Sequence, residues 1–157
     1  MQTLIRTQKL NIGINEAWDF FSNPENLSTI TPGFMRFEIT SKTKNTRMYP
    51  GMIITYIVSP MLNIPFNWVT EIAHVNEPNF FVDNQKSGPF KFWHHQHFFN
   101  EVPLGVEMTD IVNYAAPLSP ISLPIENIII KKRVEKIFDF RYKKLEQMFG
   151  KQPSNHS

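Results

Sequence analysis

The chain of 157 residues contains no cysteine. This absence excludes disulfide bonds, thiolate nucleophiles and every zinc site that uses cysteine ligands. A chain without disulfides suits a reducing compartment, and we therefore expect a cytoplasmic protein. Residues 1–10 alternate polar and apolar side chains and lack the continuous apolar run of a secretory signal, so no signal peptide is expected.

Long apolar runs and concentrated positive charge are also missing. No window approaches the roughly 20 apolar residues of a membrane helix, so stable membrane insertion is not expected. The formal net charge is only +2, and basic residues cluster only at 131–133 and 143–144. That distribution lacks the basic stripe that neutralises a phosphate backbone, which argues against a nucleic-acid partner. We interpret residues 131–133 as a solvated helix face in preference to a docking site for an anionic membrane or an acidic partner.

Aromatic residues, by contrast, are abundant. The chain has 14 phenylalanines, and its overall content is 41% hydrophobic and 13% aromatic. This composition and length predict a single domain at residues 1–150, followed by a disordered tail at 151–157. So many rings indicate either a bulky core or the wall of an apolar cavity, and composition alone leaves both readings open.

Proline, glycine and asparagine divide the chain into short segments with strand-like or helical patterns. Strands are predicted at residues 2–10, 34–40, 52–58, 66–75, 80–84, 90–100 and 106–115. Two short helices are predicted after the first strand, the second at residues 25–30, and one long helix at about 125–149. Because the connections between strands are too short for crossover helices, the strands should pair antiparallel. The sequence thus predicts an α+β fold in which a curved sheet of about seven strands grips one long helix.

The segment 88–99 holds three of the five histidines. Alternation along a strand places Trp93, His95 and His97 on one face. If residues 101–104 form a four-residue hairpin loop, His95 lies opposite Asp110 on the next strand. A slip of two residues would place Asp110 opposite Trp93 or His97, on the same face. A histidine and aspartate group is therefore expected in either register.

This group has three interpretations. Asp110 could hold one imidazole tautomer so that His95 or His97 binds a polar ligand head or transfers a proton. We favour a buried, satisfied polar contact that fixes the strand register. As metal ligands the two histidines lack an evident third donor, because Glu107 should face away from Asp110, and we expect no metal or other cofactor. Asp83 and Gln85 are interpreted as turn or strand-end residues in preference to a role at the pocket mouth.

Four blocks of sequence resemble the START-like, birch-pollen-allergen-like (SRPBCC) superfamily of helix-grip domains. They comprise residues 17–32, 68–85, 88–99 and 108–117. The resemblance covers nearly all of residues 1–150 and implies a deep cavity for lipids, polyketides or other apolar ligands, with catalysis in only some branches. It points to small bacterial proteins whose relatives are sometimes fused to an epimerase-like domain and carry a cell-division-inhibitor label. After Pro117 the chain departs from this branch, where a more glycine-rich turn would be expected.

The leading hypothesis is a protein that binds or carries an apolar small molecule between sheet and helix, and a non-enzymatic role is favoured. The alternatives are a cyclase, dehydratase or hydrolase that uses the histidine and aspartate pair, or a regulatory module of an epimerase-like partner. The entrance is expected near residues 60–65 and 117–124, and both a monomer and a homodimer stay open. The candidate ligand-binding residues are Trp18, Phe21, Trp68, Phe81, Trp93, His95, His97, Asp110 and Tyr114.

Overall fold

The structure is a computed structural model that describes residues 1–43, 46–59, 63–116 and 124–150, without the side chains of 124–127. The predicted tail at 151–157 and most of the predicted entrance, residues 60–62 and 117–123, lie outside the described residues. In chain order the elements are β1 (Gln2–Leu10), α1 (Ile14–Phe21), the 3₁₀ helices η1 (Pro24–Ser28) and η2 (Gly33–Met35), β2 (Glu38–Ile39), β3 (Ile53–Val58), β4 (Phe66–Asn76), β5 (Phe80–Ser87), β6 (Phe92–Val102), β7 (Gly105–Ala115) and α2 (Pro124–Phe149).

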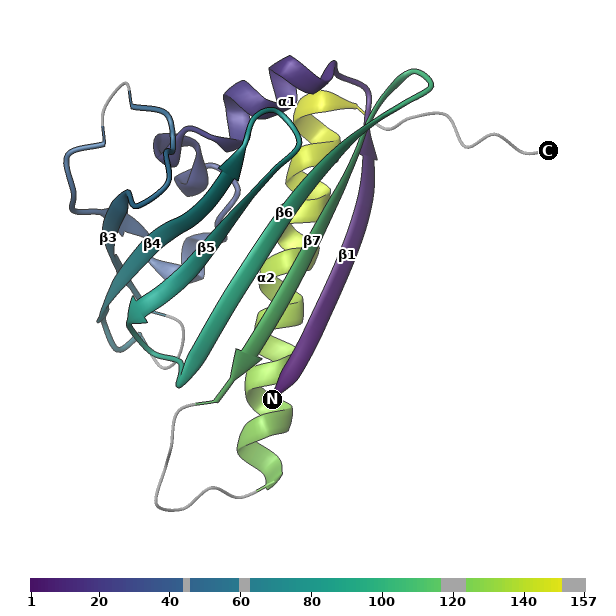
Figure 1. Ribbon diagram of the computed structural model, residues 1–157. Helices are drawn as coiled ribbons and strands as arrows, with labels where there is room; N and C mark the ends of the chain where they lie inside the picture. Colours follow the sequence, from purple (N-terminus) through teal and green to yellow (C-terminus); the bar gives the residue numbers. More distant parts are fainter. Residues whose placement is uncertain (44–45, 60–62, 117–123, 151–157) are drawn as a thin grey trace.

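One antiparallel sheet contains all seven strands of the described chain, in the order β1-β7-β6-β5-β4-β3-β2. The long helix α2 runs along one face of this sheet, while α1 lies at one end of it (Figure 1). The pairing of β4 with β5 shifts register at two places, and such irregularities increase the bend of a sheet. The predicted α+β fold, a curved sheet around one long helix, is confirmed.

The strand predicted at residues 34–40 is largely wrong. Only Glu38–Ile39 pairs with β3, whereas Gly33–Met35 forms η2. Arg36 follows η2 with a φ of 46°, in the left-handed region, which interrupts the extended alternation that a strand needs. The buried Met35 also accepts a hydrogen bond at its carbonyl oxygen from the Ser59 backbone, 2.6 Å away, and is thereby tied to the end of β3.

The β6–β7 hairpin differs from its predicted form. Its strands continue to Val102 and Gly105, so the turn contains only Pro103 and Leu104, and His97 rather than His95 lies opposite Asp110. Proline favours the first central position of a tight turn, and Leu104, with a φ of 71°, supplies the left-handed conformation that the second position of a type II turn requires. The four-residue loop assumed above was therefore too long, which displaced the predicted register by two residues.

Aromatic rings fill the end of the structure that α1 covers. This helix buries Ala17, Trp18 and Phe21 against the sheet. The Trp18 ring lies 6.1 Å from the rings of both Phe81 and Phe99 in edge-to-face contact. Such pairs are favourable because the positive edge of one ring meets the negative face of the other. At this end the rings form a packed core.

The buried stripe of α2 confirms the helical spacing that its sequence predicts. Its buried side chains are those of Ile130, Val134, Phe138, Arg141 and Leu145. Arg141 is the exception in chemistry, since a guanidinium occupies a position where the pattern calls for an apolar side chain. A charge so placed must find a partner inside the protein.

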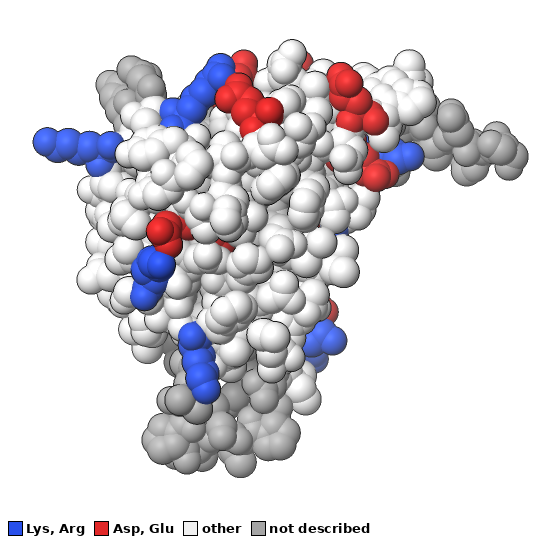
Figure 2. Space-filling view, in the orientation of Figure 1, with Lys and Arg blue, Asp and Glu red and all other residues white. Residues whose placement is uncertain are grey.

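Charged side chains are scattered over the visible face of the molecule (Figure 2). On the face shown in Figure 2 the lysine and arginine side chains stand apart from one another and form no stripe. Lys131 and Lys132 are exposed, as a solvated helix face requires, but Arg133 is half-buried and its guanidinium lies 3.8 Å from the centre of the Phe34 ring. Among the described helices, none combines the length and apolar character needed to span a membrane.

The turn of the β6–β7 hairpin provides a test of this local geometry. Leu104 is 69% exposed, so its side chain contributes little packing, while its positive φ is costly for any residue with a Cβ atom. Leu104→Gly should therefore raise the free energy of unfolding by about 1 kcal/mol in urea denaturation. Leu104→Ala, which keeps the Cβ atom, should give no comparable gain. Equal stability of the two variants would show that the left-handed conformation carries no strain.

Candidate functional site

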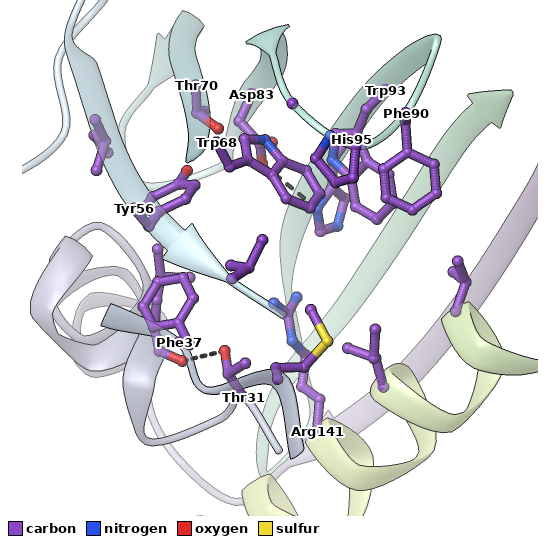
Figure 3. Close-up of a pocket in the computed structure, with 18 of the residues that line it drawn as sticks. Thr31, Phe37, Tyr56, Trp68, Thr70, Asp83, Phe90, Trp93, His95 and Arg141 are labelled. Carbon is purple, nitrogen blue, oxygen red and sulfur yellow. Dashed lines mark hydrogen bonds and ion pairs between the residues drawn. The ribbon is translucent and has the colours of Figure 1, made fainter. Parts of the chain in front are cut away.

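A cavity of about 340 Å³ lies between the inner face of the sheet and α2. Aromatic side chains line its sheet side, including those of Tyr56, Trp68, Phe90 and Trp93, and Phe37 also borders it (Figure 3). The Trp68 ring lies 5.2 Å from the ring of Trp93 and 5.6 Å from that of Phe90. The helix contributes aliphatic side chains, which are those of Ile130, Val134 and Ile137. Most of the wall is therefore apolar.

Five of the candidate ligand-binding residues line this cavity, namely Trp68, Phe81, Trp93, His95 and His97. The other four do not. Trp18 and Phe21 belong to the packed core beneath α1. Tyr114 is buried and donates its hydroxyl hydrogen to the Gln2 side-chain oxygen, 2.7 Å away. Asp110 lies behind the histidines, on the side away from the cavity. The predicted set thus divides into cavity wall, core and a supporting layer.

Phe90 lines the cavity although strand alternation placed it on the opposite face from Trp93. The strand begins only at Phe92, so alternation does not govern Phe90. The Gln85 side chain holds this segment in place, because its amide nitrogen donates to the Phe90 carbonyl at 2.6 Å and its oxygen accepts from the Phe90 N–H at 3.2 Å. Gln85, interpreted above as strand-end chemistry, therefore positions a ring of the cavity wall.

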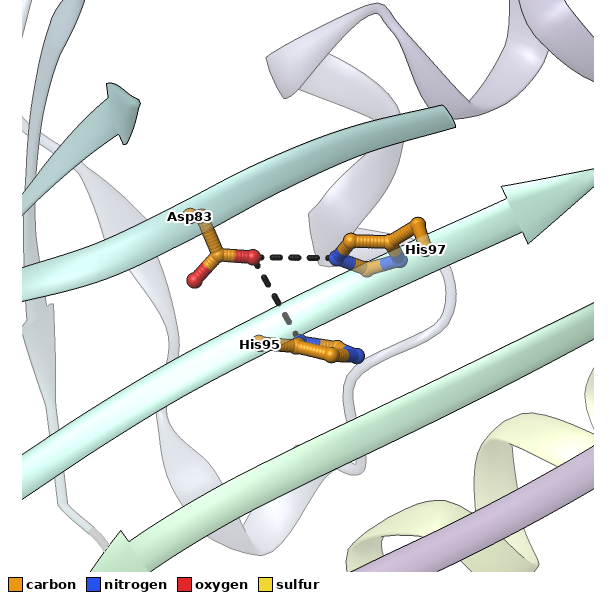
Figure 4. Close-up of side chains that lie close together, drawn as sticks. All are labelled: Asp83, His95 and His97. Carbon is orange, nitrogen blue, oxygen red and sulfur yellow. Dashed lines mark hydrogen bonds and ion pairs between the residues drawn. The ribbon is translucent and has the colours of Figure 1, made fainter. Parts of the chain in front are cut away.

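A compact polar cluster occupies part of the wall, and its members come from β5, β6, β7 and α2. The His95 Nε2 atom lies 2.9 Å from Asp110 Oδ1, and the His97 Nε2 atom lies 2.9 Å from Asp83 Oδ2. The second nitrogens lie near the other carboxylates, with His95 Nδ1 3.4 Å from Asp83 Oδ2 and His97 Nδ1 2.9 Å from Asp110 Oδ1, but His97 Nδ1 makes no hydrogen bond among the described residues. Both imidazoles thus lie between the same two carboxylates, and Figure 4 shows the Asp83 side of this arrangement.

Arg141 joins this cluster from the helix, with its Nη1 atom 3.5 Å from Asp110 Oδ2. Its partner is therefore a carboxylate of the sheet. Asp139 instead pairs with Arg6 at 3.3 Å. The Nε and Nη1 atoms of Arg141 are buried and have no hydrogen-bond partner among the described residues.

Burial and charge set the protonation of the cluster. Burial lowers the pKa of His95 to about 4, and the neighbouring His97 acts in the same direction, so His95 is neutral at pH 7. Burial also opposes a charge on His97, but its contacts with Asp110 and Asp83 outweigh that effect and raise its pKa. Burial alone would raise the pKa of Asp110, yet Arg141 and the two imidazoles hold it well below its usual range.

The pKa of Asp83 is also lowered, because the imidazoles and Arg141 outweigh the opposing effect of burial. With His97 protonated, its charge and that of Arg141 balance the charges of Asp83 and Asp110. The cluster is then neutral overall, as a group of charges inside a protein must be if it is not to be costly.

Asp83 is the residue of this site that sequence reasoning missed. It pairs directly opposite His95, because β5 extends to Ser87 and adjoins β6. The signal was present in the alternation of residues 81–85, which places Asp83 on the same face as Phe81. The connection to β6 is too irregular for a turn rule to give the register, so the sequence alone did not bring Asp83 to the histidines.

Comparison with protein-family models gives no match, and neither does comparison with curated proteins. Solved structures do match. A protein from Thermus thermophilus is 12% identical with a TM-score of 0.74, and the match covers 93% of this chain and 95% of that one. A START superfamily protein from Mycobacterium smegmatis is 12% identical with a TM-score of 0.64, covering 93% and 98%. Ara h 8.0201 is 12% identical with a TM-score of 0.60, also covering 93% and 98%.

At these identities the comparisons show the fold alone. The chain has the START-like helix-grip fold that the sequence resemblance implied, and that prediction is confirmed. The relation to proteins fused to an epimerase-like domain stays a prediction.

The charge balance of the cluster predicts the behaviour of Asp110 variants. Asp110→Asn leaves Arg141 buried without its carboxylate partner, and should lower the free energy of unfolding by about 3–5 kcal/mol in urea denaturation. Glu107→Gln, on the outer face of β7, is the control and should change it by less than about 0.5 kcal/mol.

The double variant Asp110→Asn/Arg141→Met removes both charges and should recover most of the loss, because His97 and Asp83 still balance each other. A double variant as unstable as the two single losses added together would contradict the assigned pairing.

Proposed function

We propose that this protein binds and carries an apolar small molecule in the cavity between sheet and α2. The observation that carries the proposal is a cavity of about 340 Å³ whose wall is built mainly from aromatic and aliphatic side chains. Small-molecule sites typically occupy about 300–1,000 Å³ and combine such a wall with a few polar groups. A single ligand-binding domain at residues 1–150 and a cytoplasmic location stay predictions that accompany this proposal.

The wall also carries a few polar side chains, among them those of Tyr56, Thr70 and Asp83. In a mostly apolar site such groups fix the orientation of a ligand. A mainly apolar ligand with one polar group therefore fits this wall.

An enzyme remains the second candidate for a specific reason. His95 and His97 line the cavity, and a neutral imidazole such as that of His95 can accept a proton. Carriage is favoured because both imidazoles are engaged with Asp83 and Asp110, which suits a group that shapes the wall. A regulatory role for an epimerase-like partner stays a prediction. Both a monomer and a homodimer also stay open.

Native mass spectrometry of gently purified protein, followed by denaturing extraction, tests the proposal. We expect a co-purifying apolar molecule, or failing that a thermal shift with members of a panel of lipids and aromatic polyketides. A clean apo mass together with no thermal shift across the panel would overturn carriage.

A cavity-filling variant identifies the place of binding. Val134 lines the cavity from α2, and Val134→Trp should reduce binding of the ligand at least about tenfold by occupying its space, at a stability cost of about 1–3 kcal/mol. Ile128→Trp is the matched control, since Ile128 lies on the same helix and is 53% exposed. Equal binding by both variants would place the ligand outside the cavity.

A further inference from the structure

We propose that Asp83, His95 and His97 form a binding site for a divalent first-row transition metal ion, and that Asp110 orients both imidazoles from behind. The three residues come from the neighbouring strands β5 and β6, and one donor atom from each lies within 4.8 Å of the others. All three also line the cavity. The site goes beyond the proposed carriage and does not depend on what the cavity holds.

The contact between His95 and Asp83 is the first argument. His95 directs its Nε2 atom at Asp110 Oδ1, 2.9 Å away, and its Nδ1 atom at Asp83 Oδ2, 3.4 Å away. Both carboxylate oxygens accept hydrogen bonds and cannot donate one. With a metal ion between Nδ1 and Asp83, a single N–H group on Nε2 satisfies Asp110.

The distances are the second argument. Zinc lies about 2.0–2.1 Å from imidazole nitrogen and about 2.0–2.2 Å from carboxylate oxygen, so donors of a tetrahedral site are about 3.4 Å apart. The separation of His95 Nδ1 from Asp83 Oδ2 is 3.4 Å, and that of His97 Nε2 from Asp83 Oδ2 is 2.9 Å. For one ion to bind all three donors, the second separation must lengthen by about half an ångström, and the separation of the two imidazole nitrogens, which is at most 4.8 Å, must also be near about 3.4 Å. The imidazoles direct these nitrogens to the same carboxylate oxygen, as Figure 4 shows.

Asp110 is the third argument. Metal-bound histidines commonly direct the nitrogen that is not bound to the ion at a carboxylate, which fixes their tautomer and makes them better ligands. Asp110 Oδ1 forms a hydrogen bond with His95 Nε2 at 2.9 Å. It also lies 2.9 Å from His97 Nδ1, which has no hydrogen bond among the described residues. Arg141 in turn neutralises Asp110. A buried carboxylate so placed is what a supporting layer for two ligating imidazoles requires.

The donor set indicates the class of ion. Two imidazoles and one carboxylate suit zinc or ferrous iron better than calcium or magnesium, which prefer oxygen ligands. Three protein ligands leave at least one coordination position of the ion open. Because all three side chains line the cavity, a ligand in the cavity would approach the ion at that position.

Calorimetric titration of the metal-stripped full chain with zinc chloride tests the site, with visible absorption of the cobalt(II) protein as a second readout. We expect one ion per chain. Asp83→Asn should weaken zinc binding by more than about 100-fold, and Asp110→Asn by about 10–100-fold, because the first variant loses a ligand and the second only its support.

His94→Gln is the matched control and should bind zinc as the wild type does. His94 lies on β6 directly before the proposed ligand His95, but its Nδ1 atom contacts Asn84 Oδ1 at 2.6 Å on the opposite face. Should Asp83→Asn fail to fold, His97→Gln replaces it. A flat titration of the wild-type protein would overturn the proposal, as would equal losses in His94→Gln and the ligand variants.

Discussion

The pairing of buried charges around Asp110 constrains the rest of this structure. Its carboxylate, on β7, faces both imidazoles of β6 and the Arg141 guanidinium of α2, so two other elements converge on one side chain. A carboxylate loses its hydration when it is buried, and each of these contacts offsets part of that cost. Hydrophobic contacts alone would allow α2 to slide or rotate over an apolar sheet. The ion pair is directional, and so it specifies which face of the helix meets which strand.

This specification explains how a cavity persists in a chain so rich in rings. Under α1 the rings of Trp18, Phe81 and Phe99 pack against one another and fill the space. Farther along, a cavity separates the sheet from α2, and Trp68 and Trp93 line it on the sheet side. The aromatic residues therefore form a packed core at one end of the structure and the wall of a cavity farther along, so both interpretations of the composition apply.

Sequence reasoning recovered the fold because its signals are local. Alternation, turn residues and the spacing along α2 predicted six of the seven strands and the long helix. The strand predicted at residues 34–40 was wrong for most of its length, because Arg36 adopts a left-handed conformation. Predicting the candidate site also requires the register between neighbouring strands, which depends on residues far apart in the sequence. The face shared by His95, His97 and Asp110 was correctly predicted, since a two-residue slip preserves it. The place of Asp83 was not predicted, because it depends on strand pairing across an irregular connection. The place of Phe90 was not predicted either, because two hydrogen bonds from the Gln85 side chain hold it there.

The pairing of β1 with β7 has a consequence for how the molecule forms. Gln2 lies opposite Tyr114, so the first strand of the chain completes its hydrogen bonds only with the last strand of the sheet. During synthesis β1 therefore has no partner strand until more than a hundred further residues have been added. Loop closure over such a separation is entropically slow, and an exposed strand edge invites association with other chains. The order of translation thus makes the nascent chain most vulnerable just before β7 leaves the ribosome.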